Sequence, residues 1–347
     1  MSKHVYTFEN IHIQYKKYNI EYEYLEKYKD FILEFYNNPI EQNDLTIYDS
    51  EQLFILGLYY CYFENNYSKA KKYLLMATSK DNCMAMYYLA LYYELIKINI
   101  KLAIKYHKMA IDKNYSKSMN YLACIYGNKD GYKNYDLMKK YHLMAISNNN
   151  INSMLNLGSY YYNNENNIEM FKKYYLMAIS KENSIAMNKL GLYYQQIEKN
   201  YSEAKKYYLM AIDIGNSEAM NNLGLYYQQI EKNYPEAKKY YLMAIEKNNI
   251  KSIYNLGLYY QQIEKNYPES KKYYLIATNK GCSKSMNNLA IYYKQIEKNY
   301  TEAKKYYLMA ISNGNSDAII NLGLYYSEIE KNHYEAQKYF LMAKSIK

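Results

Sequence analysis

Apolar residues recur along most of this chain at the spacing of one helix face, and two such stretches form a pair. An i, i+3, i+4, i+7 order of apolar positions predicts a first helix from about Ser184 to Ile197. The same spacing returns and predicts a second helix from about Tyr201 to Ile214. The two stripes consist of Met187, Leu190, Gly191 and Tyr194, and of Ala204, Tyr207, Tyr208, Ala211 and Ile212.

The helix pair returns every 33 residues, apart from one step of 35. A small residue in LGLYY-like sequence marks each first helix, at Gly57, Ala90, Ala123, Gly158, Gly191, Gly224, Gly257, Ala290 and Gly323. Such a period is typical of stacked units that bury their apolar faces against each other in one continuous elongated core. We therefore predict an all-α, α/α superhelical solenoid whose repeats span 50–82, 83–115, 116–150, 151–183, 184–216, 217–249, 250–282, 283–315 and 316–347.

Polar and small residues predict where the second helices begin and end. Asn200 and Glu203 have the spacing of a capping box, and Pro235 lies in the equivalent first turn of another repeat, where a missing N–H is harmless. Gly215 stands where the helix should end in a left-handed conformation. Its equivalents are Gly281, Gly314, Asn114, Asn149 and Asn248. The connections are short, so we expect antiparallel helices.

Small residues also predict a close approach of the helices. Gly191 and Ala211 lie where two helix axes should meet, and Gly224→Val is expected to overpack the core at a cost of about 1–3 kcal/mol. We interpret the tyrosine and methionine stripes as core residues rather than as a ligand site.

Residues 1–49 do not follow the repeat. Residues Ile20–Tyr36 predict an amphipathic helix, ended by Asn37, Asn38 and Pro39, which we expect to cap the open face of the first repeat. At the other end Lys344 replaces the isoleucine of earlier repeats, which makes the last face more polar.

Charge and cysteine usage narrow the function classes. The net charge of +10 comes from lysine alone, because the sequence holds no arginine and therefore no planar fork for phosphate. This charge is spread over the repeats, which favours solubility over a nucleic-acid footprint. The four cysteines lack CxxC spacing, and the chain shows neither a signal-peptide pattern nor a long apolar run. We expect free thiols, no membrane and cytoplasmic or nuclear residence.

Nothing in the sequence indicates catalysis. Nucleotide-binding glycine motifs, HExxH and a nucleophile elbow are all missing from it. His107 and His142 take the place of Tyr208 without carboxylate or thiol companions, so we expect packing rather than metal binding. The chain is predicted to be no enzyme and to need no cofactor.

Two series of residues resemble the Sel-1-like repeat, a branch of the tetratricopeptide-like solenoids, over residues 50–347. They are Ala219, Leu223, Gly224 and Tyr227 in the first helix, Ala237, Tyr240, Tyr241, Ala244 and Ile245 in the second, and Gly215 as the closing glycine. Two features depart from the family pattern. Tyrosine replaces the family's tryptophan, and the connection between the two helices is about three residues shorter.

The resemblance implies a concave groove lined by the first helices. Its side chains would be Asn188, Leu192, Gln195 and Gln196; Asn221, Leu225, Gln228 and Gln229; Tyr254, Leu258, Gln261 and Gln262; and Asn287, Ile291, Lys294 and Gln295. Amide side chains donate and accept, so such a ladder can hold an extended peptide, with leucines supplying apolar contact. A solvated helix face is the alternative interpretation. The lysine pairs, such as Lys205 and Lys206, are expected on a solvated convex face, with an acidic partner as their alternative.

The resemblance implies a non-catalytic adaptor or scaffold that binds a protein or peptide partner. One alternative is nucleic-acid binding by a basic helical-repeat array. It is disfavoured because base-reading repeats vary at their code positions, whereas Asn188, Asn221 and Asn287 are the same. Self-association of near-identical repeats is another alternative, which light scattering would test.

Overall fold

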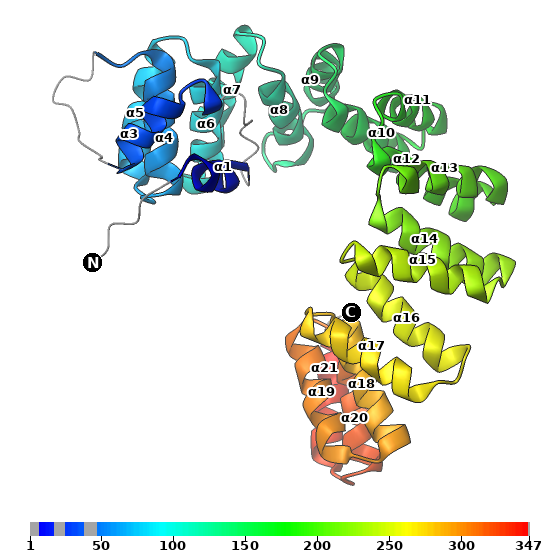
Figure 1. Cartoon of the computed structure of the whole chain (residues 1–347). Helices are drawn as coiled ribbons and strands as arrows, with labels where there is room; N and C mark the ends of the chain where they lie inside the picture. Colours follow the sequence, from blue (N-terminus) through cyan, green and yellow to red (C-terminus); the bar gives the residue numbers. More distant parts are fainter. Residues whose placement is uncertain (1–6, 17–24, 38–46, 346–347) are drawn as a thin grey trace. The chain divides into compact units, whose positions relative to one another are not determined.

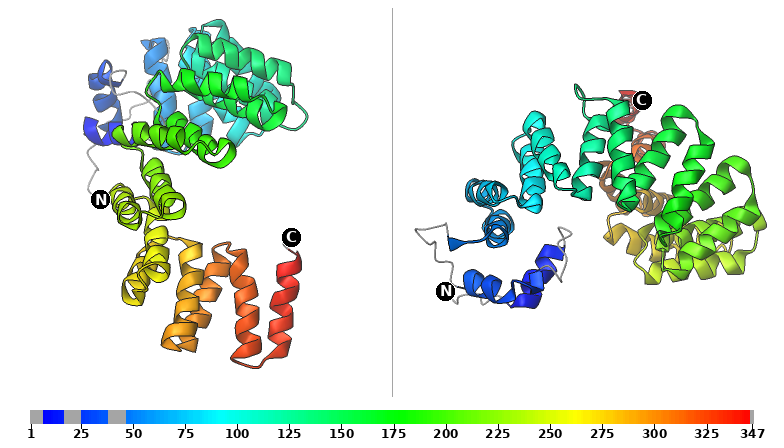
Figure 2. Two further views of the ribbon diagram at one scale, coloured as in Figure 1. Left: turned by 90° about the vertical axis from the view of Figure 1, so that its right-hand side faces the viewer. Right: turned by 90° about the horizontal axis from the view of Figure 1, so that it is seen from above.

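The computed structural model describes residues 7–16, 25–37 and 47–345, and within these ranges every regular element is helical (Figure 1). From residue 50 onward the helices come in pairs joined by short turns, as the period predicts. Two further views show the same pairing (Figure 2). The all-α repeat fold predicted from the sequence is thereby confirmed.

The first helices of the nine pairs in residues 50–345 are α4 (Ser50–Tyr62), α6 (Cys83–Leu91), α8 (Ser116–Asn128), α10 (Ile151–Glu165), α12 (Ser184–Tyr193), α14 (Ser217–Tyr226), α16 (Ile250–Gln262), α18 (Ser283–Tyr292) and α20 (Ser316–Glu328). The second helices are α5 (Tyr67–Ser79), α7 (Ile100–Asp112), α9 (Tyr135–Ser147), α11 (Ile168–Ile179), α13 (Tyr201–Asp213), α15 (Tyr234–Glu246), α17 (Tyr267–Asn279), α19 (Tyr300–Ser312) and α21 (His333–Ser345). The helices α6, α12, α14 and α18 continue into π-helical turns, η2 (Tyr92–Ile96), η3 (Tyr194–Glu198), η4 (Tyr227–Glu231) and η5 (Tyr293–Glu297).

The π-helical turns show how the short connection between paired helices is made. In the fifth repeat η3 is followed by Lys199 in a left-handed conformation, with φ 54°, and then by Asn200, the residue that caps α13. The backbone N–H of Asn200 donates to the carbonyl of Tyr194 at 2.9 Å. One widened turn and one left-handed residue thus reverse the chain without the longer connection of the family pattern.

The predicted helix ends are confirmed, but the capping box is wrong. The side chain of Asn200 accepts a hydrogen bond from the N–H of Glu203 at 3.2 Å. The Glu203 carboxylate pairs with Lys206 at 3.2 Å instead of reaching back, because the N–H of Asn200 already bonds to Tyr194. The second helices end in left-handed residues as expected: Gly215 (φ 80°), Gly281 (83°), Gly314 (78°), Asn114 (58°), Asn149 (57°) and Asn248 (60°).

In the fifth, sixth, seventh and ninth repeats the glycine of LGLYY lies directly over an aromatic ring of the second helix. A Cβ atom at Gly224 would lie 2.7 Å from two ring carbons of Tyr241 and 3.2 Å from the carbonyl oxygen of Ala237. Both distances are shorter than an ordinary carbon contact, so the ring packs against the bare backbone. The predicted close approach at this position is confirmed.

Tyrosine stacking fills the place of the family's tryptophan. Tyr240, at that place, stacks on Tyr227 with ring centroids 5.6 Å apart and planes 9° apart. Such pairs contribute about 0.5–1.5 kcal/mol beyond the area they bury. The equivalent stacked pairs are Tyr60–Tyr73, Tyr93–Tyr106, Tyr126–Tyr141, Tyr161–Tyr174, Tyr194–Tyr207, Tyr260–Tyr273, Tyr293–Tyr306 and Tyr326–Tyr339.

The two lysines of each pair on the second helices have different roles. Lys238 lies 3.0 Å from Glu264 and 4.8 Å from the ring centroid of Tyr260, both in the next repeat. Lys239 is exposed and pairs with Glu236 of its own helix at 3.1 Å. The expected solvated face therefore fits the second lysine, while the first joins neighbouring repeats. Lys205, Lys271 and Lys304 make the same bridge as Lys238.

The predicted helix over residues 20–36 is partly wrong. Its first five residues lie outside the described ranges, and a turn separates Leu25 from α3 (Lys29–Asn37). At this turn the N–H of Tyr28 donates to the carbonyl of Leu25, three residues back, at 3.0 Å. The preceding helix α1 (Phe8–Lys16) was not predicted.

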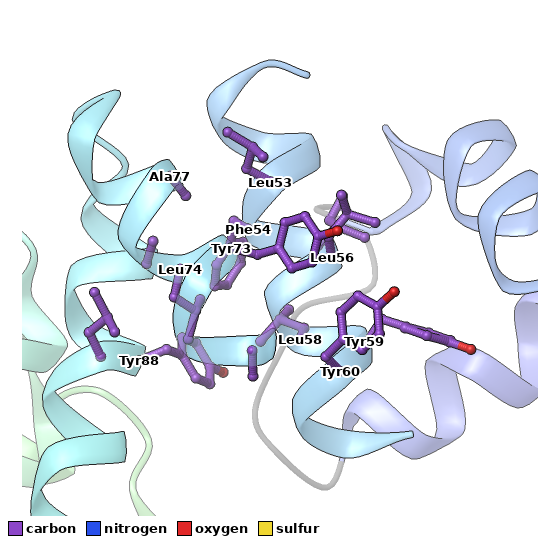
Figure 3. Close-up of a cluster of buried hydrophobic side chains, with 14 of the residues drawn as sticks. Leu53, Phe54, Leu56, Leu58, Tyr59, Tyr60, Tyr73, Leu74, Ala77 and Tyr88 are labelled. Carbon is purple, nitrogen blue, oxygen red and sulfur yellow. The ribbon is translucent and has the colours of Figure 1, made fainter. Parts of the chain in front are cut away.

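The described N-terminal helices α1 and α3 pack on the first repeat. Tyr36 of α3 meets Tyr59 of α4 edge to face with ring centroids 4.6 Å apart. Tyr15 of α1 meets Phe63, the residue that ends α4, at 5.4 Å. These rings belong to one aromatic cluster, part of which is drawn in Figure 3.

The chain divides into two compact units, residues 1–174 and 175–347, with the boundary inside α11. Within each unit consecutive helices pack on each other, for example α5 on α6 in the first unit and α15 on α16 in the second. A core continuous across the boundary stays a prediction, and so do the cap segment 1–49 and the repeat limits taken from the sequence.

Candidate functional site

The asparagines expected to line the groove are buried and bonded between neighbouring repeats. The side chain of Asn221, with an exposed fraction of 3%, accepts hydrogen bonds from Ser252 at 2.9 Å and Asn255 at 2.8 Å. The equivalent bonds run from Asn222 to Asn188 and from Asn321 to Asn287, both at 2.9 Å. The amide oxygens of this ladder therefore join α12 to α14, α14 to α16 and α18 to α20.

Glutamines on the same face are also bonded within the protein. Gln195 accepts a hydrogen bond from the hydroxyl of Tyr208 at 2.7 Å. The same bond joins Gln228 to Tyr241 at 2.8 Å and Gln261 to Tyr274 at 2.7 Å. Gln295 is exposed, and the place of Gln195 in its repeat is taken by Lys294, which pairs with Glu328 at 2.7 Å. Leu192, Leu225 and Leu258 are half-buried. A binding role for this set stays a prediction.

Open space on the first-helix side is found in the first unit. A cavity of about 350 Å³ lies between the first two repeats, lined by Leu58, Cys61, Leu74, Tyr88, Leu91 and Leu95 among others. We call it the apolar cavity, since no charged side chain lines it. Leu58 and Leu74 reach it from α4 and α5, and Tyr88 reaches it from α6 (Figure 3).

Two further cavities, both lined by asparagines, adjoin the apolar cavity along the first helices. One, of about 420 Å³, shares Tyr121 with it and is lined by Asn128, Asn152 and Asn156. The other, of about 270 Å³, shares Asn128 and Asn156 with the 420 Å³ cavity and is also lined by Asn163. We call these two the amide cavities, and all three together the groove. The groove belongs to the first four repeats and lies wholly within the first unit.

The groove is open because smaller residues replace a bonded pair. The bond from Tyr208 to Gln195 closes the space between the two helices of the fifth repeat. In the first repeat Leu74 and Cys61 stand at these two positions, and both line the apolar cavity. In the third repeat His142 and Gly127 stand there and line an amide cavity.

The groove is close to neutral. Its acidic residue Glu94 pairs with its basic residue Lys129 at 3.3 Å. Burial lowers the pKa of His142 to about 4 and raises the pKa of the Cys61 thiol to about 11, so both are uncharged near pH 7. Burial also raises the pKa of Tyr88. The groove can therefore offer apolar contact and neutral hydrogen-bonding groups.

The two histidines singled out in the sequence lie in the core. His107 is fully buried, and its Nδ1 lies 3.3 Å from the hydroxyl of Ser118 in the next repeat. His142 lies 3.1 Å from Ser153 in the same way. In the part of the chain that the structure describes, no three potential metal ligands gather. Within the same residues, no helix has both the length and the apolar character that a membrane span requires.

The sequence analysis expected a groove lined by residues of the fifth to eighth repeats, whereas these three cavities lie in the first four. The cavities occur where the pattern is broken, as at Leu74, Cys61, Gly127 and His142. A comparison of repeats position by position would have revealed these four departures.

Comparison with known proteins decides the family. The sequence model of the Sel1 repeat matches residues 53–82, 83–115, 184–216, 217–249, 250–282, 283–315 and 316–345, well over half of the chain. The chain belongs to the Sel1 repeat family. No curated protein matches it in sequence. The third and fourth predicted repeats, which line the amide cavities, are outside the matched segments.

Solved structures show the same fold in distant relatives of this Sel1 repeat chain. A protective antigen present in uropathogenic Escherichia coli strains, displaying an SLR fold, is 20% identical with a TM-score of 0.55, over 94% of this chain and 72% of the other. A Sel1 repeat protein from Oxalobacter formigenes is 22% identical with a TM-score of 0.51, over 70% and 100%. Yeast Tom70 is 17% identical with a TM-score of 0.53, over 88% and 66%. At these identities the likeness concerns the fold alone.

Proposed function

We propose that this Sel1 repeat chain is a non-catalytic binding protein that holds an extended segment of a partner protein in the groove of its first unit. The observation that carries the proposal is the run of three adjoining cavities along α4, α6, α8 and α10. Function as an adaptor follows if other surfaces bind a second partner.

The amide cavities suit a peptide backbone. Side-chain amides present both donors and acceptors, as peptide groups do, so they can pair with a strand that has no partner of its own. Asn152 and Asn163 are exposed on this path, whereas Asn156 already donates to Asn120 at 3.3 Å. We propose cytoplasmic residence and a protein partner for the same reasons as in the sequence analysis.

Nucleic acid is the less favoured partner, because many lysines are neutralised within the protein. Lys205, Lys238, Lys271 and Lys304 each pair with a glutamate of the next repeat. Their neighbours Lys206, Lys239, Lys272 and Lys305 each pair with a glutamate of the same helix. A protein binds nucleic acid strongly when its unpaired cations contact phosphates and release counterions. These lysines on the second helices are already paired with glutamates and are therefore poorly suited to that role.

Peptide selection tests the proposal. A displayed library of random peptides is selected against the full chain, and the affinity of the winners is measured for the variant Asn152→Tyr with Asn163→Tyr. These side chains are exposed, so larger ones should obstruct the groove and leave the fold intact. The matched control carries Ser202→Tyr and Asn279→Tyr on exposed positions of the second unit. We expect weaker binding in the groove variant alone; equal affinities, or no selectable peptide, contradict the proposal.

A further inference from the structure

Five departures from the repeat pattern converge on the apolar cavity. Three repeats contribute Tyr62, Tyr87, Tyr88, Leu95 and Tyr121 to its wall. The equivalent residues four repeats later are Gln196, Asn221, Asn222, Gln229 and Asn255, which are all amides. Apolar or aromatic side chains thus replace every one of these amides at a single place.

The space in the cavity comes from two further departures. Leu74 and Cys61 replace the tyrosine and glutamine whose hydrogen bond fills the equivalent space in the fifth repeat. The resulting volume, about 350 Å³, lies within the range of about 300–1,000 Å³ typical of pockets that enclose a small ligand. The wall is mostly apolar, so water gains little there and an apolar group gains much.

The uncharged wall of the apolar cavity and the nature of the adjoining amide cavities indicate which chemical group the apolar cavity binds. No charged side chain lines the cavity, and a charged group placed there would be buried without a partner at high cost. The adjoining amide cavities are lined by asparagines and by the neutralised pair of Glu94 and Lys129. Peptide groups can form further hydrogen bonds with these amides, whereas a lipid tail can form none.

We propose that the apolar cavity is an anchor site for one bulky, uncharged side chain of the bound segment, with uncharged backbone on its flank in the amide cavities. The partner is then recognised by a single aliphatic or aromatic residue within a stretch of small polar residues. This inference rests on the proposed function and names the chemistry of its ligand.

The chain contains no tryptophan, so the fluorescence of a tryptophan in an added peptide can report binding. Short peptides of serine, asparagine, threonine and glycine around one tryptophan are acetylated and amidated, so that their indole is the sole tryptophan in the mixture, because the chain has none. On binding we expect a blue shift of the tryptophan emission. Replacement of the anchor by aspartate, measured by competition, is expected to weaken binding by about tenfold or more.

The decisive variant fills the cavity with the pair that the chain already uses elsewhere. Cys61→Gln with Leu74→Tyr reproduces Gln195 and Tyr208 in the first repeat, and should raise the Kd by about tenfold or more. The control, Cys282→Gln with Leu308→Tyr in the second unit, should leave it unchanged. Alkylation of the native thiols tests the same site in the wild-type chain. Bound peptide should slow the alkylation of Cys61 and leave that of Cys83 unchanged.

Each contrary result has its own meaning. Peptides that bind the filled variant as tightly as the wild type, or bind without protecting Cys61, overturn the anchor site and leave the proposed function standing. Peptides that bind nowhere in the groove overturn both. Uptake of a medium-chain fatty acid, with protection of Cys61 and no peptide binding, overturns the anchor in favour of a lipid site.

Discussion

At the scale of single residues, Gly224 tests how tightly the two helices of a repeat pack. Gly224→Val should lower the free energy of unfolding by about 1–3 kcal/mol, because even a Cβ would lie 2.7 Å from the ring of Tyr241. Gly224→Ala should cost less, since Ala290 holds the same place over Tyr307 in the eighth repeat. Urea unfolding of the two variants measures the difference; equal stabilities would contradict the close packing.

The buried histidines predict an acid-sensitive stability. Desolvation lowers the pKa of His107 to about 3 and that of His142 to about 4, below their ordinary value in the unfolded chain. As the pH falls, the unfolded chain therefore takes up protons at these histidines before the folded chain does. The free energy of unfolding is unaffected above about pH 6.5 and decreases below it, by on the order of 2 kcal/mol per histidine at pH 5.

The control for this prediction comes from the other repeats, which carry tyrosine at the same place. The variant His107→Tyr with His142→Tyr should lose much less stability than the wild type between pH 7 and pH 5. Unfolding curves at both pH values decide it. Parallel losses in the two proteins would mean that other groups set the acid sensitivity.

At the scale of elements, the asparagine ladder joins successive first helices. Asn221→Ala removes the acceptor of two donors, on the buried Ser252 and the half-buried Asn255, and should destabilise the chain by about 1–3 kcal/mol. Asn279→Ala, at an exposed helix end, serves as the matched control and should change stability little. Thermal unfolding compares them; a neutral Asn221→Ala would show that the ladder contributes no net stability.

The turn between α6 with η2 and α7 holds a residue poorly suited to its backbone. Ile98 has φ 50° and is 80% exposed, at the place where other repeats carry lysine or asparagine. A left-handed conformation costs an ordinary residue about 1–2 kcal/mol, and asparagine less. Ile98→Asn should therefore raise the midpoint of urea unfolding, by more than Lys232→Asn does at the equivalent turn. An unchanged or lower midpoint for Ile98→Asn would contradict a free-energy cost of this size for the left-handed backbone at Ile98.

At the scale of the whole molecule, the sequence predicts what depends on short-range spacing. The period and the apolar stripes predict the paired helices, because residues such as Met187 and Leu190 lie on one face of one helix. The bond from Asn222 to Asn188 joins residues 34 positions apart, and no local pattern indicates it. The π-helical turns were not predicted for a similar reason. The backbone of each turn also accepts a hydrogen bond from the residue that caps the next helix, so no pattern within the turn itself indicates it.

The groove shows a second limit of sequence reasoning. A consensus of the repeats directs attention to residues that are alike, such as Gln195 and Gln228, and these prove to be bonded within the protein. The departures Leu74 and Cys61 lie 13 residues apart and acquire meaning only when α4 and α5 bring them together. In this chain of near-identical repeats, residues that differ, such as these two, indicate the proposed groove.

Hydrogen exchange of the full chain, with and without a selected peptide, tests the central claim most directly. Binding in the groove predicts slower exchange along α4, α6, α8 and α10 and in the parts of α5 and α9 that also line it, with residues 175–347 unchanged. Protection confined to the second unit, or to the second helices of the first, would contradict the groove as the site.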